Sequence, residues 1–172
     1  MEKINAFKSI LYETFDFHKD LYSNGLFNNK LYHNYFGDAN NRQEMCRLVE
    51  KVFKAKDIYV YYDGKIFMHD SLSFSKKSIL MDYLEDHATN SMDSFVISTR
   101  NLSEFIYMDT IFEDIFLLSA KSPIIVEEIV NMDTKLADTW IGKISNQQLQ
   151  KRFLSGMYIT KRKLRKLIHI YG

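Results

Sequence analysis

Apolar positions recur at helical spacing in two stretches near the N-terminus. Ile4 to Tyr22 carries apolar residues at this spacing, which predicts one helix, and Gly25 is a candidate left-handed C-cap after it. Arg42 to Lys56 repeats the pattern and predicts a second helix. The residues between them, 26–41, mix aromatic side chains with Asn and Gly and predict an irregular segment. The apolar stripe of the second helix consists of Met45, Leu48, Val49, Val52 and Phe53.

Residues 57–70, DIYVYYDGKIFMHD, carry the clearest short-range pattern. Two β-rich runs flank Asp63-Gly64, a pair that tolerates positive φ at both central positions of a two-residue turn. We therefore predict an antiparallel hairpin, with residues 94–99 as a candidate third strand beside it. Ser75 is a candidate N-cap for a helix between the hairpin and this strand.

Beyond residue 100 the pattern indicates helices. Phe105, Met108, Phe112, Ile115 and Phe116 would share one helical face, and Ser122-Pro123 is typical of a helix start. These patterns together predict an α+β fold that is predominantly helical, with a small antiparallel hairpin or sheet at residues 57–70 and 94–99. Residues 1–100 would form the α+β core and residues 101–172 a helical part, with a soft boundary that also allows one domain.

Composition places the chain among globular proteins with a substantial core. Hydrophobic residues make up 46% of the 172 residues and aromatic residues 15%. Disordered chains are poor in residues of these types, and a chain of this size can bury a core. Cys46 is the only cysteine, so no internal disulfide can form, and its place in the second helical stripe predicts a buried, inert thiol. No apolar run is long enough to span a membrane, and we expect a cytoplasmic protein. A bias towards Ile, Lys and Asn indicates a low-GC microbe or mobile element.

Motifs for catalysis, cofactors and metals are missing from the sequence. No GxSxG elbow and no glycine-rich phosphate loop occurs, and no two histidines have the spacing of a helical zinc site. Asp16, His18 and Asp20 would diverge on a helix, so we do not expect them to bind a metal. His69-Asp70 is read as a polar pair at a strand end. The sequence therefore predicts a protein that is not an enzyme and holds no cofactor or metal.

Charge is unevenly distributed along the chain, although the net charge is +1. Residues 101–140 carry eight acidic and two basic side chains, whereas residues 151–172 carry seven basic and no acidic ones. Such separation indicates a polarised surface, a contact between the two segments, or both. It is the strongest global signal in the sequence.

The basic C-terminal stretch predicts a helix–turn–helix-like unit. Ser145 or Asn146 would cap a short helix, Gly156 would turn the chain, and Thr160 would cap a final helix. At 100° per residue, the final helix separates an apolar face from a cationic one, with Lys161 and Lys163 at the margins. The apolar face comprises Leu164, Leu167, Ile168 and Tyr171, and the cationic face comprises Arg162, Arg165, Lys166 and His169.

We predict from these features a non-catalytic regulatory or inhibitory binding protein of a low-GC microbe, phage or plasmid, whose C-terminal helix contacts DNA or RNA. One alternative is a protein–protein inhibitor or adaptor that blocks a host nucleic-acid enzyme or defence complex. Others are a docked helix whose cations face only water, and a metal-dependent nuclease that uses His69-Asp70. The residues expected to bind nucleic acid or a partner are Lys151, Arg152, Lys161, Arg162, Arg165, Lys166 and His169.

Overall fold

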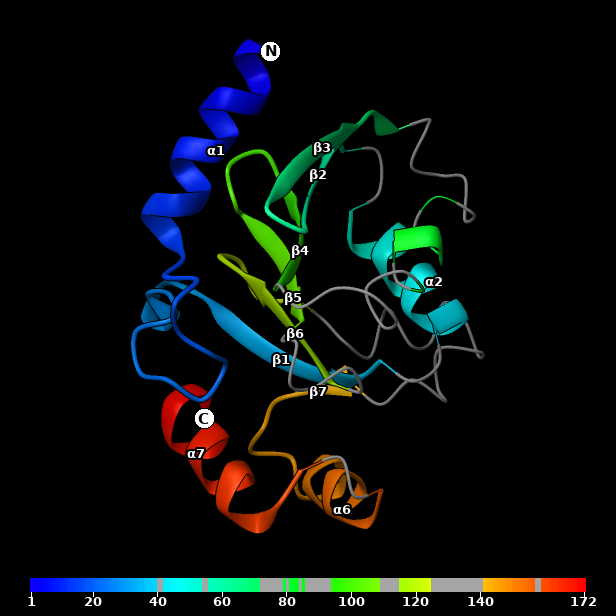
Figure 1. Cartoon of the computed structure of the whole chain (residues 1–172). Coiled ribbons are helices and arrows are strands. Elements are labelled where there is room, and N and C mark those ends of the chain that lie inside the picture. Colours follow the sequence, from blue (N-terminus) through cyan, green and yellow to red (C-terminus); the bar gives the residue numbers. More distant parts are fainter. Residues whose placement is uncertain are drawn as a thin grey trace.

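The computed structural model describes residues 1–39, 42–53, 56–71, 79, 81–83, 85, 94–108, 115–124, 141–156 and 159–172. In this part of the chain, a seven-stranded antiparallel sheet with the order β3-β2-β4-β5-β6-β1-β7 is flanked by helices (Figure 1). The strands are β1 (His33–Asp38), β2 (Ile58–Tyr62), β3 (Lys65–His69), β4 (Phe95–Thr99), β5 (Glu104–Met108), β6 (Ile115–Ala120) and β7 (Ile141–Gly142). The helices are α1 (Glu2–Thr14), the 3₁₀ turn η1 (Asn29–Leu31), α2 (Arg42–Val52), α6 (Gln147–Ser155) and α7 (Lys161–Tyr171).

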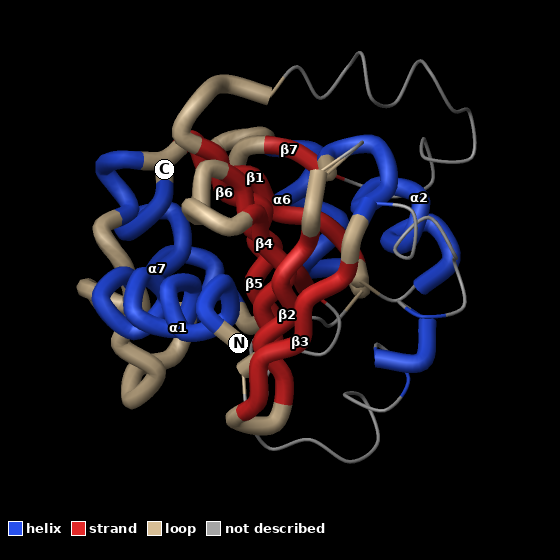
Figure 2. The backbone as a smooth tube through the Cα atoms, turned by 90° about the horizontal axis from the view of Figure 1, so that it is seen from above, coloured by secondary structure: helices blue, strands red, loops and turns tan. Residues whose placement is uncertain are grey.

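Each face of the sheet packs against its own set of helices. Figure 2 shows α1 and α7 on one side of the sheet and α2 on the other. In β2, Tyr59 and Tyr61 join the core cluster that contains α1, α6 and α7, whereas Val60 and Tyr62 join the cluster that contains α2. Since successive strand residues point to opposite faces, a strand buried on both sides contributes to both clusters. The fold is therefore mixed α+β, as predicted, but its sheet is much larger than the predicted hairpin.

The hairpin itself is confirmed. Asp63 and Gly64 have φ of 50° and 68°, so both central residues of the turn adopt the left-handed conformation that the Asp-Gly pair allows. β4 covers residues 95–99 and pairs antiparallel with β2, as expected for the third strand. α2 begins at Arg42 as predicted, and Cys46 is buried on it.

The helical interpretation of the residues after position 100 is wrong where β5 and β6 are found. In β5, Phe105 and Tyr107 face one core cluster and Ile106 and Met108 face the other. A strand buried on both faces forms a continuous apolar run, and periodicity alone does not separate such a run from a buried helix. The sheet also crosses residue 100, because β4 pairs with β5.

The segment predicted as irregular, residues 26–41, contains the central strand β1. β1 lies between β6 and β7, so its partners come from residues more than 70 positions later in the chain. Its polar residue Asn34 is buried and accepts a hydrogen bond of 2.7 Å from the Ser119 hydroxyl on β6. That bond satisfies the amide oxygen inside the core, which explains how an Asn can stand in a central strand.

The first helix ends at Thr14, well before the predicted end at Tyr22. The Asp16 carboxylate accepts a hydrogen bond from the backbone N–H of His18 (3.2 Å), and Asp20 accepts one from that of Tyr22 (3.0 Å). Such local side-chain bonds stabilise turns in competition with a helix. Gly25 has the expected positive φ of 89°, but it lies in a loop instead of capping the helix. Ser75 and the segment after Ile124 that was predicted as a helix lie outside the described residues.

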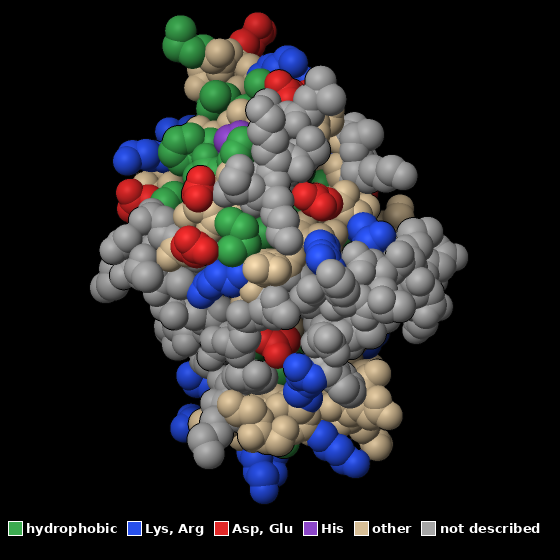
Figure 3. Space-filling view, turned by 90° about the vertical axis from the view of Figure 1, so that its right-hand side faces the viewer, with side chains coloured by type: hydrophobic (Ala, Val, Ile, Leu, Met, Phe, Trp, Pro, Cys, Tyr) green, Lys and Arg blue, Asp and Glu red, His purple; other side chains and the backbone are tan. Residues whose placement is uncertain are grey.

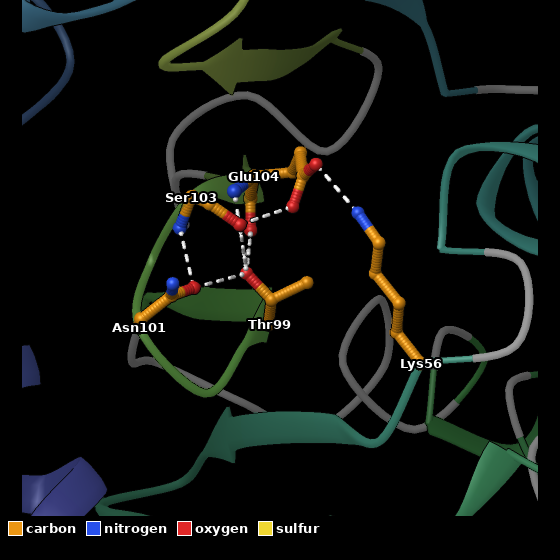
Figure 4. Close-up of polar contacts among 5 residues, drawn as sticks. All are labelled: Lys56, Thr99, Asn101, Ser103 and Glu104. Carbon is orange, nitrogen blue, oxygen red and sulfur yellow. Dashed lines mark hydrogen bonds and ion pairs between the residues drawn. The ribbon is translucent and has the colours of Figure 1, made fainter.

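A polar network closes the turn between β4 and β5 (Figure 4). The Lys56 ammonium donates to Glu104 Oε1 at 2.6 Å, and the Ser103 hydroxyl donates to Glu104 Oε2. The Glu104 backbone N–H donates to Thr99 Oγ1 at 3.3 Å, and the Ser103 N–H donates to the Asn101 amide oxygen at 3.2 Å. Burial would raise the pKa of the Glu104 carboxyl, but the bonds from Lys56 and Ser103 outweigh it and lower the pKa.

This lowered pKa predicts a loss of stability in acid. Unfolding returns the Glu104 pKa to its ordinary value, so the unfolded chain binds more protons as the pH falls from about 6 to about 3. The contribution of Glu104 is thus complete above the unfolded pKa and disappears as the pH falls through the folded one. We expect Glu104→Gln to lower the free energy of unfolding by about 1 kcal/mol at neutral pH and by less at about pH 3, where protonation of the carboxylate removes part of its contribution. Urea unfolding across this range tests it; an equal loss at both pH values would contradict it.

Candidate functional site

Side-chain caps fix the starts of both C-terminal helices. Asn146 Oδ1 accepts hydrogen bonds from the backbone N–H groups of Gln148 (2.9 Å) and Leu149 (3.1 Å) at the start of α6. Thr160 Oγ1 accepts one from the N–H of Lys163 (3.3 Å) at the start of α7. These bonds satisfy amide groups that have no partner within the helix. The two predicted helices and their caps are confirmed, and of the two candidates Ser145 and Asn146 the cap of α6 is Asn146.

The apolar face of α7 is docked on the protein. Leu164, Leu167 and Tyr171 are buried, and Ile168 is half-buried. The Tyr171 hydroxyl donates a 2.8 Å hydrogen bond to the backbone carbonyl of Leu21. At the same end of the helix, the Asn29 amide donates to the carbonyl of Ile170 at 2.6 Å. α7 is therefore a fixed element of the fold, and the direction of its opposite face is fixed with it.

That opposite face forms one side of a shallow hollow. Arg162, Arg165, Lys166 and His169 are exposed and line a hollow of about 440 Å³, which we call the α7 groove. Tyr22 and Asn24, from the loop after α1, complete its lining together with Ile170, and none of these lining residues is acidic. Figure 3 shows Lys and Arg side chains at the lower end of the molecule, where α6 and α7 lie in Figure 1.

The α7 groove suits a ligand that carries several negative charges. Guanidinium groups bind phosphate or carboxylate with two parallel hydrogen bonds, and an ammonium adds a compact point charge. Arg162, Arg165 and Lys166 lie on one face of α7 within about one helical turn, so their charges form a compact cluster. Such a cluster attracts a ligand with several negative charges, whether these lie on one group or on neighbouring groups.

The other predicted residues lie outside the groove. Lys151 and Lys161 are exposed on α6 and at the start of α7. Arg152 forms an ion pair with Asp38 at 3.4 Å, and the Asp38 side chain is 7% exposed, so Arg152 compensates a buried carboxylate at the end of β1. Four of the seven predicted residues therefore line the groove, whereas Lys151, Arg152 and Lys161 do not.

Tyr22 and Asn24 were not predicted to belong to the site. They are separated from α7 by about 140 residues, and the sequence pattern predicts Tyr22 as the end of a helix and Gly25 as its cap. The Lys163 ammonium lies 5.5 Å from the centre of the Tyr22 ring, so a cation from α7 stands over an aromatic face of this loop. Periodicity along α7 contains no information about which distant loop covers its margin.

His69-Asp70 is the alternative candidate site, proposed for a metal-dependent nuclease, and its histidine is bonded to a tyrosine. His69 Nε2 is hydrogen-bonded to the Tyr83 hydroxyl at 3.0 Å, and burial lowers the pKa of its imidazole, an effect that Asp70 partly opposes. Asp16, a member of the other histidine-containing pattern, pairs with the Lys19 ammonium at 3.0 Å. Within the described ranges, no group of three His, Cys, Asp or Glu side chains is arranged to hold a metal ion.

Three further results concern membrane-spanning helices, the acidic stretch and the comparison with known proteins. No helix in the part of the chain that the structure describes is both long and apolar enough to cross a bilayer. Seven of the eight acidic residues of the 101–140 stretch lie outside the described residues, and Glu104, the remaining one, pairs with Lys56. Comparison with protein-family models, with curated proteins and with solved structures gives no match.

Proposed function

We propose that the protein is a non-catalytic binding protein, regulatory or inhibitory in role, that contacts nucleic acid through the α7 groove. One observation carries this proposal: four cationic or titratable side chains of one docked helix line a single exposed hollow. The opposite face of the same helix is committed to the core, so these cations are held in position. Phosphate groups of a nucleic-acid backbone supply closely spaced negative charges, which such a cationic face attracts.

The proposal is tested by removing the charges while keeping the helix. Arg162→Ala, Arg165→Ala and Lys166→Ala in one variant should leave the fold intact, because these side chains are exposed and alanine favours helices. We expect binding to a fluorescein-labelled DNA or RNA to weaken by at least about a hundredfold at low salt. The slope of log affinity against log salt should fall by about 2 to 3, since each phosphate contact contributes about 0.7 in a single strand and about 0.9 in a duplex. Fluorescence anisotropy at several salt concentrations measures both.

A matched control carries the same change in net charge elsewhere. Lys3, Lys65 and Arg100 lie on α1, on β3 and in the turn after β4, are exposed, and do not line the α7 groove. Their triple replacement by alanine should keep most of the affinity and the salt slope. Equal losses in both triple variants would show that only net charge matters and would refute the groove as the site. Absence of nucleic-acid binding by the unaltered protein, with capture of a nucleic-acid enzyme from a host lysate, would favour the inhibitor alternative instead.

A further inference from the structure

Three hollows on the α1–α7 side of the molecule are neighbours, because each shares one lining residue with the next. We call this series of hollows the track. The largest, of about 960 Å³, shares Tyr32 with a hollow of about 270 Å³. The second hollow in turn shares Ile170 with the α7 groove. The track therefore leads from the end of α1, past the C-terminus of the chain, to the cationic face of α7.

The first hollow is lined by aromatic rings. Tyr12 is 47% exposed, and Phe17 and Tyr32 are half-buried. Phe17 stacks on Tyr61 with ring centroids 4.5 Å apart, and Tyr12 meets both rings edge-on at 5.7 and 6.3 Å. The Tyr32 hydroxyl donates to the carbonyl of Leu102 at 3.1 Å, which fixes that ring at the other side of the hollow. We call this the aromatic hollow; its rings are held in place by the core, while Tyr12 remains accessible.

The three hollows differ in the balance of acidic and basic residues that line them. In the aromatic hollow, Glu13 and Asp16 accompany Lys121, whereas Lys30 and Lys143 line the middle hollow together with the terminal residue Gly172. The α7 groove has cations but no acidic lining residue. Phosphates are therefore favoured in the groove and disfavoured beside the two carboxylates, which instead can accept hydrogen bonds from the amino groups of bases.

Lysines also stand over tyrosine rings along the track. The Lys121 ammonium lies 5.9 Å from the Tyr32 centroid, and Lys8 lies 6.0 Å from that of Tyr12. These positions, where a cationic ligand would bind to an aromatic cage, are already held by the protein's own ammonium groups. A neutral aromatic ligand, in contrast, is not repelled by these lysines and can stack against the exposed part of the Tyr12 ring.

We propose that the track binds a single strand of nucleic acid, with its phosphates against the α7 groove and the middle hollow and a base stacked against Tyr12 in the aromatic hollow. This inference rests on the proposed function and adds the form of nucleic acid that is bound. A positively charged groove combined with aromatic platforms is the arrangement by which proteins bind single strands. A duplex can place phosphates on α7, but its bases are stacked inside the helix and do not reach the aromatic hollow.

Binding of a single strand of about 15 nucleotides should be compared with binding of the same strand annealed to its complement. We expect the single strand to bind at least about tenfold more tightly. Tyr12→Ala should remove most of this preference by weakening single-strand binding about tenfold, and Tyr12→Phe should restore it because the ring suffices for stacking. A 2-aminopurine placed in the strand should lose fluorescence on binding to the unaltered protein and to Tyr12→Phe, but not on binding to Tyr12→Ala.

A second variant tests the middle of the track without touching the rings. Lys30→Gln with Lys143→Gln should lower the salt slope for the single strand by about 1.4, since each phosphate of a single strand contributes about 0.7. Equal affinity for single strand and duplex, or full single-strand binding by Tyr12→Ala, would overturn the inference. If the α7 triple variant still abolished binding in that case, the proposed function would stand without it. Displacement of the strand by inorganic polyphosphate at equal phosphate concentration would likewise show that charge alone binds and overturn the stacking role.

Discussion

Replacing Leu167 by alanine is expected to lower the free energy of unfolding by about 2–5 kcal/mol. Leu167 is fully buried on the docked face of α7, in the core cluster that also contains residues from α1 and the central strands. Alanine would remove apolar contacts and leave a cavity, because the surrounding strands and helices can close it only in part. Since domains are marginally stable, a loss of this size is a large fraction of the total. Chemical denaturation followed by far-UV circular dichroism measures it.

The neighbouring residue provides the control. Lys166 lies on the exposed face, and Lys166→Ala should change the free energy of unfolding by less than about 0.5 kcal/mol. The proposed function predicts the opposite order of effect on nucleic-acid affinity, with Lys166→Ala weakening binding more than Leu167→Ala when both proteins are folded. If both variants changed the free energy of unfolding by less than about 0.5 kcal/mol, α7 would not be packed on the protein. The arrangement of side chains in the α7 groove would then be refuted.

Local parts of the fold could be predicted from the sequence. The hairpin depends on Asp63-Gly64, two adjacent residues whose left-handed conformations define the turn. The capping of α7 likewise depends on Thr160 and the residues directly after it. Such features depend on interactions between residues that are close in the sequence. A short sequence pattern therefore includes every residue that takes part in them.

The larger sheet could not be predicted in the same way. β1 was interpreted as irregular because its sequence, HNYFGD, contains Asn and Gly, residues that strands usually avoid. Asn34 is tolerated because Ser119 satisfies its amide oxygen, and Gly37 because the Phe116 ring occupies the space of a side chain. Both compensating residues lie on β6, about 80 positions away. A rule based on local propensity has no access to such compensation, so it assigns a central strand to a loop.

The candidate site likewise contains residues that local sequence predicts and residues that depend on distant parts of the chain. The four groove residues of α7 could be found because helical geometry brings positions 162, 165, 166 and 169 to one face. Tyr22, Asn24 and the aromatic hollow could not, because they depend on how the loop after α1 packs beside α7. Arg152 has the same charge as the groove residues, and its ion pair with the buried Asp38 could not be foreseen because the two residues are more than 100 positions apart.

Gly37→Ala tests the close contact between β1 and the Phe116 ring of β6. We expect it to lower the free energy of unfolding by about 3 kcal/mol. Gly37 on β1 lies directly opposite Phe116 on β6, and a Cβ at position 37 would overlap the Phe116 ring. Both residues are buried, so the ring cannot move aside without disturbing the cluster that contains Phe95 and Leu118. Gly142→Ala on β7 is the matched control, because a Cβ there would make ordinary contacts, at 3.9 Å from the Asn146 amide nitrogen. We expect it to cost less than about 1 kcal/mol.

A double-mutant cycle with Phe116→Ala decides whether overlap with this ring is the cause. Phe116→Ala alone should cost about 3–5 kcal/mol through the cavity that it leaves. In the double variant the new methyl group would occupy part of that cavity, so the combined cost should fall short of the sum by about 1–3 kcal/mol. Additive costs would mean that the penalty at position 37 arises in the backbone of β1 and not in the ring opposite. The close approach of the β1 backbone to Phe116 would then have no part in specifying β1 as the strand between β6 and β7.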